Sequence, residues 1–142
     1  MLPKDMKIEY FELLKAGEDI LDESGNVIYR CKDLTNPPKK SRSYAFCSDT
    51  GYDPGLVEHL TGLDMIYHET TFLEEKEKWA RKTFHSTTRD AAVIARDAGV
   101  KKLLIGHFSA RYRDIQPFVD ECRNIFPESY PAEEGKTYLI KE

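Results

Sequence analysis

From position 44 onward, short apolar runs alternate with segments that have helical character. The runs at 44–48, 63–67 and 102–106 have the length and the apolar content of buried strands. This alternation predicts an α/β layer architecture, in which helices cover the face of a sheet. Ligands in such sheets bind at the carboxyl ends of the strands, so the residues that follow each run are the first candidates for a functional site.

Helix-end signals mark the segments between these runs. Asp53 and Pro54 supply an N-cap and a proline at the first helical position. Thr87 and Asp90 resemble a capping box, and Pro127 would stop the last helix. We therefore expect helices at 53–60, 73–82, 91–98 and 115–126, and a final strand at 136–140.

The first 43 residues have a different pattern. Segments 18–21 and 27–30 predict two short strands joined by a glycine-containing turn. Residues 36–42 form a proline-stiffened basic loop, which cannot lie in a central strand. We expect the chain, 1–142, to be one domain's worth of protein, in which a hairpin and basic loop at 1–43 precede a β/α core at 44–142.

Composition narrows the class of function. The formal net charge is −4, the wrong sign for a protein that holds nucleic acid by charge alone, so any RNA contact would be local. Three cysteines without a Cys-x-x-Cys pair argue against a disulfide framework and against a thiolate zinc site. No apolar run approaches the ~20 residues of a membrane span, and the amino terminus has no signal-peptide pattern. We expect a cytoplasmic protein without a membrane partner.

Two residues that closely follow predicted strands have side chains suited to metal ions. The carboxylate of Asp49 has two oxygens and can bridge two metal ions, although an aspartate before a turn at Gly51 is also a common turn residue. His107 follows Gly106, which leaves room for a close backbone approach, and a neutral imidazole is a good zinc ligand. The alternative for His107 is a structural histidine at the end of a strand.

Four segments resemble a known family when they are taken together. They are Phe-Cys-Ser-Asp-Thr, Tyr-His-Glu-Thr-Thr-Phe, Phe-His-Ser-Thr-Thr and Gly-His-Phe-Ser-Ala-Arg-Tyr, at 46–50, 67–72, 84–88 and 106–112. Their order and spacing resemble the ribonuclease Z family, tRNA 3′-processing endonucleases of the metallo-β-lactamase superfamily. Thr70 stands where the family's His-Glu-Ala-Thr motif has alanine. The family's His-x-His-x-Asp-His string does not occur in the sequence, which is therefore interpreted as the carboxyl-terminal half of such an enzyme.

The resemblance implies a fold and an activity. The fold would be α/β, half of a metallo-β-lactamase αββα sandwich, with a mixed sheet and helices on one face. The activity would be zinc-dependent hydrolysis of the phosphodiester that joins the 3′ trailer to precursor tRNA. The complete site would hold two zinc ions, with Asp49 as the bridging ligand and His107 as a ligand of the second metal. Because a zinc site needs about four ligands, the chain alone is expected to bind zinc weakly or not at all and to be inactive.

The resemblance also implies roles for three further residues. His85 would lie near the scissile phosphate and Glu69 would orient it, which leaves one imidazole nitrogen to donate a proton to the leaving oxygen. Arg111 would pair either with an RNA phosphate or with a structural carboxylate. His68 is interpreted as structural and His59 as a surface residue.

Two alternatives to a tRNA-processing enzyme stay open. One is another phosphodiesterase of the same fold, acting on a cyclic nucleotide or another phosphodiester. The other is a non-catalytic module that mediates association. In either case the predicted strands are apolar enough to be covered on both faces, whereas the helices can cover only one. We therefore expect the uncovered sheet face to bind the front half of the domain or a second copy of the chain, the latter giving a homodimer.

Overall fold

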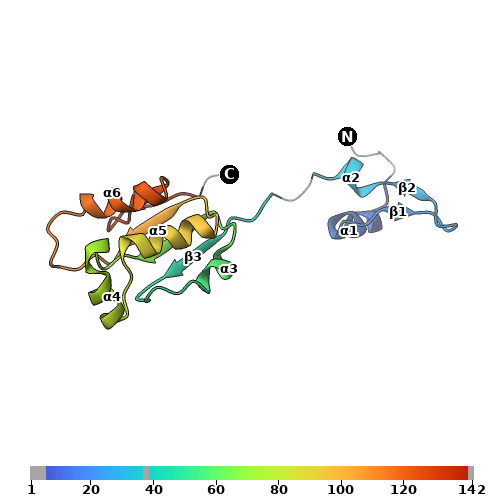
Figure 1. Ribbon diagram of the computed structural model, residues 1–142. Helices are drawn as coiled ribbons and strands as arrows, with labels where there is room; N and C mark the ends of the chain where they lie inside the picture. The colour runs from blue at the N-terminus through green and yellow to red at the C-terminus, as the bar shows by residue number, and fades with distance from the viewer. Residues whose placement is uncertain (1–5, 37–38, 141–142) are drawn as a thin grey trace. The chain divides into compact units, whose positions relative to one another are not determined.

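The computed structural model describes residues 6–36 and 39–140 and divides into two compact units, Met1–Lys40 and Ser41–Glu142 (Figure 1). Each unit has a hydrophobic core of its own. The division falls within the predicted basic loop, of which Pro37 and Pro38 lie outside the described residues. In the part of the chain that the structure describes, no helix combines the length and the apolar character needed to cross a membrane.

The first unit combines a small hairpin with two helices. Strands β1 (Ile20–Leu21) and β2 (Val27–Tyr29) are antiparallel, which confirms the predicted hairpin with shorter strands. Helices α1 (Glu9–Ala16) and α2 (Cys31–Leu34) precede and follow it and were not predicted. Neither begins with a side-chain cap, so the usual start signal is missing from the sequence. The core of this unit consists of Leu14, Ile20 and Cys31.

The second unit is built on a four-stranded sheet with the order β3 (Tyr44–Cys47), β4 (Met65–Glu69), β5 (Leu103–Gly106) and β6 (Ser129–Pro131). All neighbouring strands in this sheet are parallel. The expectation of a mixed sheet is therefore wrong for the described strands. The predicted strand at 136–140 is wrong, because that segment has no strand geometry and the fourth strand lies at 129–131. Proline at the end of β6 is tolerated because β6 is an edge strand.

The helices of the second unit overlap the predicted segments, and their ends differ from the predicted ones by up to four residues. Thr87 and Asp90 form the predicted capping box, in which each side chain accepts a hydrogen bond from the other residue's backbone N–H. A 3-10 turn at Glu74–Lys76 leads directly into the helix that begins at Glu77. The helices are α3 (Leu56–Leu60), α4 (Glu77–Thr83), α5 (Thr88–Asp97) and α6 (Gln116–Ile125).

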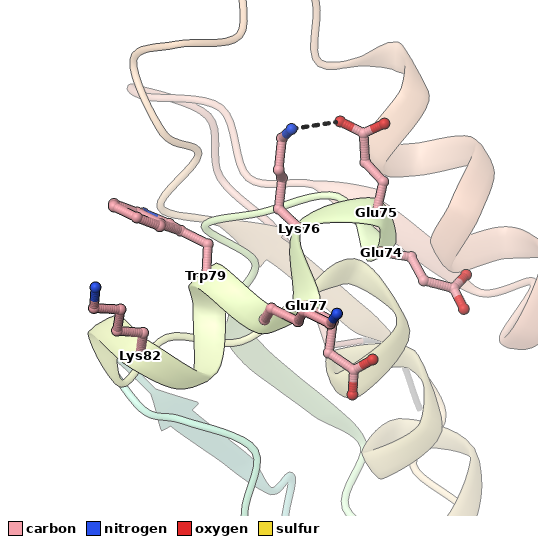
Figure 2. Close-up of a pocket in the computed structure, with 7 residues that line it drawn as sticks. Glu74, Glu75, Lys76, Glu77, Trp79 and Lys82 are labelled. Atoms are coloured by element: carbon pink, nitrogen blue, oxygen red, sulfur yellow. Dashed lines mark ion pairs between the residues drawn. The ribbon is translucent and has the colours of Figure 1, made fainter.

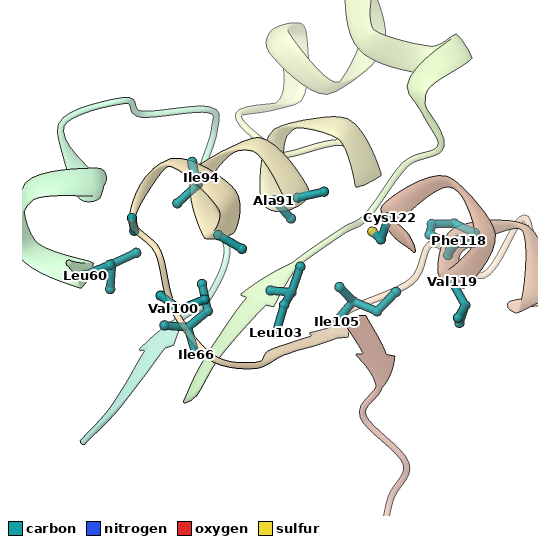
Figure 3. Close-up of a cluster of buried hydrophobic side chains, with 13 residues drawn as sticks. Leu60, Ile66, Ala91, Ile94, Val100, Leu103, Ile105, Phe118, Val119 and Cys122 are labelled. Carbon is teal, nitrogen blue, oxygen red and sulfur yellow. The ribbon is translucent and has the colours of Figure 1, made fainter. Parts of the chain in front are cut away.

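Helices α5 and α6 cover one face of this sheet, as predicted, and the main core lies between the two layers (Figure 3). Ile66, Leu103 and Ile105 of the sheet pack with Ile94 of α5 and Phe118 of α6. All five side chains are fully buried. This packing fixes the two inner strands, β4 and β5, relative to the helices, and therefore fixes the strand ends that carry Glu69 and His107.

The opposite face of the sheet is open along β3. Tyr44 and Phe46 are 49% and 62% exposed, and the ring of Phe46 stacks on Tyr67 of β4 with the centroids 4.4 Å apart. Met65 and Leu104 on the same face are buried. The described residues thus leave an uncovered apolar strip at Tyr44 and Phe46, which we call the β3 face.

Candidate active site

Three polar side chains lie at the carboxyl ends of neighbouring parallel strands. Asp49 comes two residues after β3, Glu69 ends β4 and His107 follows β5. His85 lies between α4 and α5. The structure brings the predicted residues together, since one ligand atom each of Asp49, His85 and His107 lie within 4.8 Å of one another. His85 in turn contacts Glu69.

The backbone at this cluster has an unusual conformation. Asp49 and His107 have φ angles of 36° and 60°, and His107 Nε2 lies 3.1 Å from Asp49 Oδ1. Among the described residues, the one other non-glycine residue with positive φ is Phe84, at 59°, directly before His85. Such angles are uncommon for residues with a side chain and cost of order 1–3 kcal/mol each. All non-glycine residues with positive φ in the described chain therefore lie at this one place.

Gly106 allows a close approach from the neighbouring strand. A Cβ atom at this position would lie 2.6 Å from the hydroxyl oxygen of Tyr67 and 2.8 Å from a carbon of its ring. The close approach predicted at Gly106 is therefore present, and the group that approaches is the side chain of Tyr67. A larger residue at 106 would displace either the ring of Tyr67 or the strand end that carries His107.

Glu69 is a completely buried carboxylate whose two oxygens accept five hydrogen bonds. Its Oε1 accepts from the backbone N–H groups of Thr50 at 3.2 Å and Ser86 at 3.1 Å, and from His85 Nδ1 at 2.8 Å. Its Oε2 accepts from the backbone N–H of Thr71 at 2.9 Å and from the Thr71 hydroxyl at 2.7 Å. A buried charge is tolerated when it is hydrogen-bonded in this way. Because His85 Nδ1 is the donor, the other ring nitrogen, Nε2, is left for a ligand or substrate.

The hydroxyl of Thr71 joins the two histidines to this carboxylate. Its oxygen lies 2.8 Å from His107 Nδ1 and 3.2 Å from His85 Nδ1. A threonine hydroxyl has one proton, and here that proton is donated to Glu69, so His107 Nδ1 must be the donor to Thr71. The lone pair of His107 is then on Nε2, the nitrogen that faces Asp49. Thr71 was not predicted as a site residue, although it ends the His-Glu-Thr-Thr segment.

The other two histidines have no place in the cluster. His68 is fully buried on β4, where its Nδ1 lies 2.8 Å from the backbone oxygen of Glu69 and its Nε2 has no hydrogen-bond partner. Burial lowers the pKa of His68 below its ordinary value, which favours the neutral ring. His59 is exposed on α3. These positions agree with the structural and surface roles predicted for them.

Arg111 is held by aromatic rings. Its guanidinium carbon lies 5.9 Å from the centroid of the Phe72 ring and 5.3 Å from that of Trp79. The Phe72 ring is 6.1 Å from the ring of His85. Within the described ranges no ion pair links Arg111 to a carboxylate, so the structural carboxylate predicted as one of its two possible partners is not found there. Trp79 was not predicted at the site, because its segment has the pattern of a charged surface helix.

Comparisons with known proteins identify similar sequences. No family model matches the chain. It is 42% identical to the ribonuclease Z of Cytophaga hutchinsonii over 141 residues, which cover 99% of this chain and 45% of that protein. It is 44% identical to the ribonuclease Z of Porphyromonas gingivalis over 124 residues, which cover 87% of this chain and 40% of that one. The chain thus spans less than half the length of these curated relatives.

Comparisons with solved structures agree with the sequence matches. A metallo-β-lactamase fold protein from Bacillus subtilis matches with a TM-score of 0.65 at 19% identity, over 70% of this chain and 40% of that one. The short form of human tRNase Z matches with a TM-score of 0.50 at 27% identity, over 68% of this chain and 31% of that one. The predicted fold class is therefore confirmed.

Proposed function

Because this chain is a homologue of ribonuclease Z, as its motifs predicted, we propose that it forms the carboxyl-terminal half of a zinc-dependent endoribonuclease that removes the 3′ trailer of precursor tRNA. The observation that carries the proposal is the convergence of Asp49, Glu69, His85 and His107 at one edge of a parallel sheet. The proposal places the protein in the cytoplasm. Its three cysteines, which form no disulfide, support that location.

Asp49 and His107 are the metal ligands of the proposed site. A carboxylate oxygen and a neutral imidazole nitrogen form a donor set that zinc prefers, and the Thr71 hydrogen bond leaves the His107 lone pair on the nitrogen nearest Asp49. The two zinc ions of the complete enzyme would supply Lewis acidity and an activated water. Two protein ligands are fewer than the three of a typical catalytic zinc site, so the chain alone would hold zinc weakly.

His85 is the proposed general acid, and Glu69 is its positioning partner. The Glu69 carboxylate fixes His85 through Nδ1, which directs Nε2 away from the buried carboxylate. A proton on Nε2 would be delivered to the 3′ oxygen as the phosphodiester bond breaks. Arg111, a cation without a carboxylate partner among the described residues, would bind a phosphate of the RNA beside it.

A second role for His85 is favoured by one observation. Its ligand nitrogen lies in the same 4.8 Å group as those of Asp49 and His107, which is the arrangement of three metal ligands. The two roles predict different metal contents. A general acid can be removed without loss of zinc, whereas removal of a ligand reduces the zinc content of the protein.

The β3 face is the proposed surface for assembly. Its exposed Tyr44 and Phe46 rings lie on a parallel sheet whose strand β5 is completely buried, and parallel sheets are normally covered on both faces. The missing front half of the domain would cover this face in the complete enzyme. A second copy would cover it in the isolated chain, giving a homodimer that light scattering at micromolar concentration would detect. A stable monomer at that concentration would contradict the homodimer.

The function is tested with precursor tRNA and purified components. The chain alone with zinc should not cleave the trailer. Addition of the front part of the Cytophaga hutchinsonii relative should restore cleavage at the 3′ end, provided that this part carries the His-x-His-x-Asp-His motif. A cyclic nucleotide assayed in parallel separates tRNA processing from another phosphodiesterase activity. Robust metal-dependent cleavage by the chain alone, or restored activity only on the cyclic nucleotide, would contradict the proposal.

A further inference from the structure

A surface next to the candidate active site combines an exposed indole with two cations. Trp79 of α4 is the single tryptophan of the sequence and is 42% exposed. The guanidinium of Arg111 lies 5.3 Å from its ring centroid, and Lys82 Nζ lies 5.6 Å from the same centroid. We call these three residues the Trp79 surface. Trp79 and Lys82 project to the same side of α4 (Figure 2).

The Trp79 surface is connected to the active site by a continuous series of ring contacts. The ring of His85 lies 6.1 Å from the ring of Phe72, and Phe72 lies 5.9 Å from the guanidinium carbon of Arg111. The guanidinium of Arg111 in turn lies over the ring of Trp79. A strand of RNA with one phosphodiester at His85 would therefore have neighbouring nucleotides within reach of the Trp79 surface.

The local charge at this surface is positive although the whole chain is negative. Among the described residues, neither Arg111 nor Lys82 forms an ion pair with a carboxylate. The glutamates nearest to them along α4 and its leading turn are already paired, each at 3.1 to 3.5 Å. The pairs are Glu74 with Arg89, Glu75 with Lys76, and Glu77 with Arg81. Two unneutralised cations around an exposed ring favour a ligand that is both anionic and aromatic.

We propose that the Trp79 surface is a subsite for one unpaired nucleotide of the RNA that flanks the scissile bond. The base stacks on the indole beside the cation–π contact of Trp79 with Arg111, and the phosphate pairs with Arg111 and Lys82. This inference rests on the proposed function, because it assumes an RNA substrate at His85. It assigns a role to Trp79 and Lys82, which the catalytic site does not use.

Intrinsic fluorescence tests the subsite directly, because Trp79 is the single tryptophan. Titration of the purified full chain with a short single-stranded oligoadenylate should quench the Trp79 emission in a saturable manner, and added salt should weaken the binding. Inorganic polyphosphate of matched phosphate content should quench much less, because it lacks bases. Equal quenching by polyphosphate, or no quenching by the oligonucleotide, would overturn the proposal.

Variants separate stacking from charge, with binding followed by the anisotropy of a labelled oligonucleotide. Trp79→Ala should weaken binding by about tenfold, and Trp79→Phe should weaken it less because a ring remains. Lys82→Gln should also weaken binding. The matched control is Lys102→Gln, since Lys102 lies 5.2 Å from the ring of Tyr130 in a similar contact before β5, at the strand end opposite to His107. An equal effect of the two lysine variants, or unchanged affinity in Trp79→Ala, would overturn the subsite.

Failure of this inference can be told apart from failure of the proposed function. The binding assay needs neither zinc nor cleavage, so quenching without restored tRNA processing would support the subsite and contradict the enzyme. Restored processing that is unaffected by Trp79→Ala, in both KM and kcat, would support the enzyme and contradict the subsite.

Discussion

Replacement of Glu69 by glutamine should disturb both the stability of the chain and the tautomer of His107, the proposed metal ligand. All five groups that contact this carboxylate act as donors in the native arrangement. An amide has one acceptor oxygen and one NH₂ donor. If the NH₂ faced His85, Thr50 and Ser86, three donors would oppose it. The glutamine should therefore keep its oxygen there and turn its NH₂ toward Thr71.

The magnitude follows from this orientation. The backbone N–H of Thr71, which donates to Glu69 at 2.9 Å, would lose its acceptor. A buried donor without an acceptor costs about 1–3 kcal/mol, so the free energy of unfolding should fall by about that amount. The Thr71 hydroxyl would then accept from the amide and donate to His107 Nδ1. His107 would carry its proton on Nε2, the wrong nitrogen for a zinc ligand.

Two measurements on the isolated chain check this reasoning. Denaturant unfolding followed by Trp79 fluorescence reports on the second unit, and nitrogen-15 NMR identifies the protonated ring nitrogen of His107. Glu128→Gln is the control, because Glu128 accepts from the exposed Tyr130 hydroxyl and should change the stability by less than about 0.5 kcal/mol. A Glu69→Gln variant with native stability and an unchanged His107 tautomer would refute the hydrogen-bond assignment.

Three further predictions concern the same unit. In the reconstituted enzyme, His85→Ala should lower the cleavage rate by roughly 10²–10⁴ with near-normal zinc content, whereas Asp49→Ala should lose zinc; equal zinc loss in both would make His85 a ligand. Phe84→Gly should raise the free energy of unfolding by about 0.5–1 kcal/mol in thermal unfolding, because φ is positive and the ring is 80% exposed, and a loss of stability would show that the ring packs. The hydrogen bond from Lys101 holds the pKa of Asp64 below its ordinary value of 3.8, so the stabilisation by Asp64 should be complete above pH 3.8 and be lost as the pH falls further. Asp64→Asn should flatten acid unfolding in that range, and an unchanged pH profile would exclude this contribution.

Local signals predicted the parts of the fold that depend on neighbouring residues. The capping box of Thr87 and Asp90 marked the start of α5 within the sequence itself, and the structure contains it. Strand β6 could not be found in this way, because three residues that end in proline have little strand character. Its position is set by pairing with β5, from Leu103↔Ser129 to Ile105↔Pro131, which is a long-range contact.

The site shows the same division between local and long-range information. The positions of Asp49, Glu69 and His107 at one edge of the sheet could be predicted, because each lies close to the end of a strand. His85 was identified from its motif, and the structure places it beside these residues. The role of Thr71 could not be predicted. It depends on which of its three neighbours, Glu69, His85 or His107, accepts the single proton of the Thr71 hydroxyl. Trp79 lies in a charged helix, and only the fold brings Arg111 onto its ring.

The positive φ angles of Asp49, Phe84 and His107 affect which substitutions different kinds of selection would favour. Glycine would relax the backbone at Asp49, Phe84 and His107 alike, but at 49 and 107 it would also remove a candidate ligand. A library of variants screened only for soluble expression should therefore accumulate glycine or asparagine at all three positions. A library screened for zinc retention should keep aspartate and histidine at 49 and 107 and leave 84 free to vary. Selection for folding alone would thus gradually erase this site.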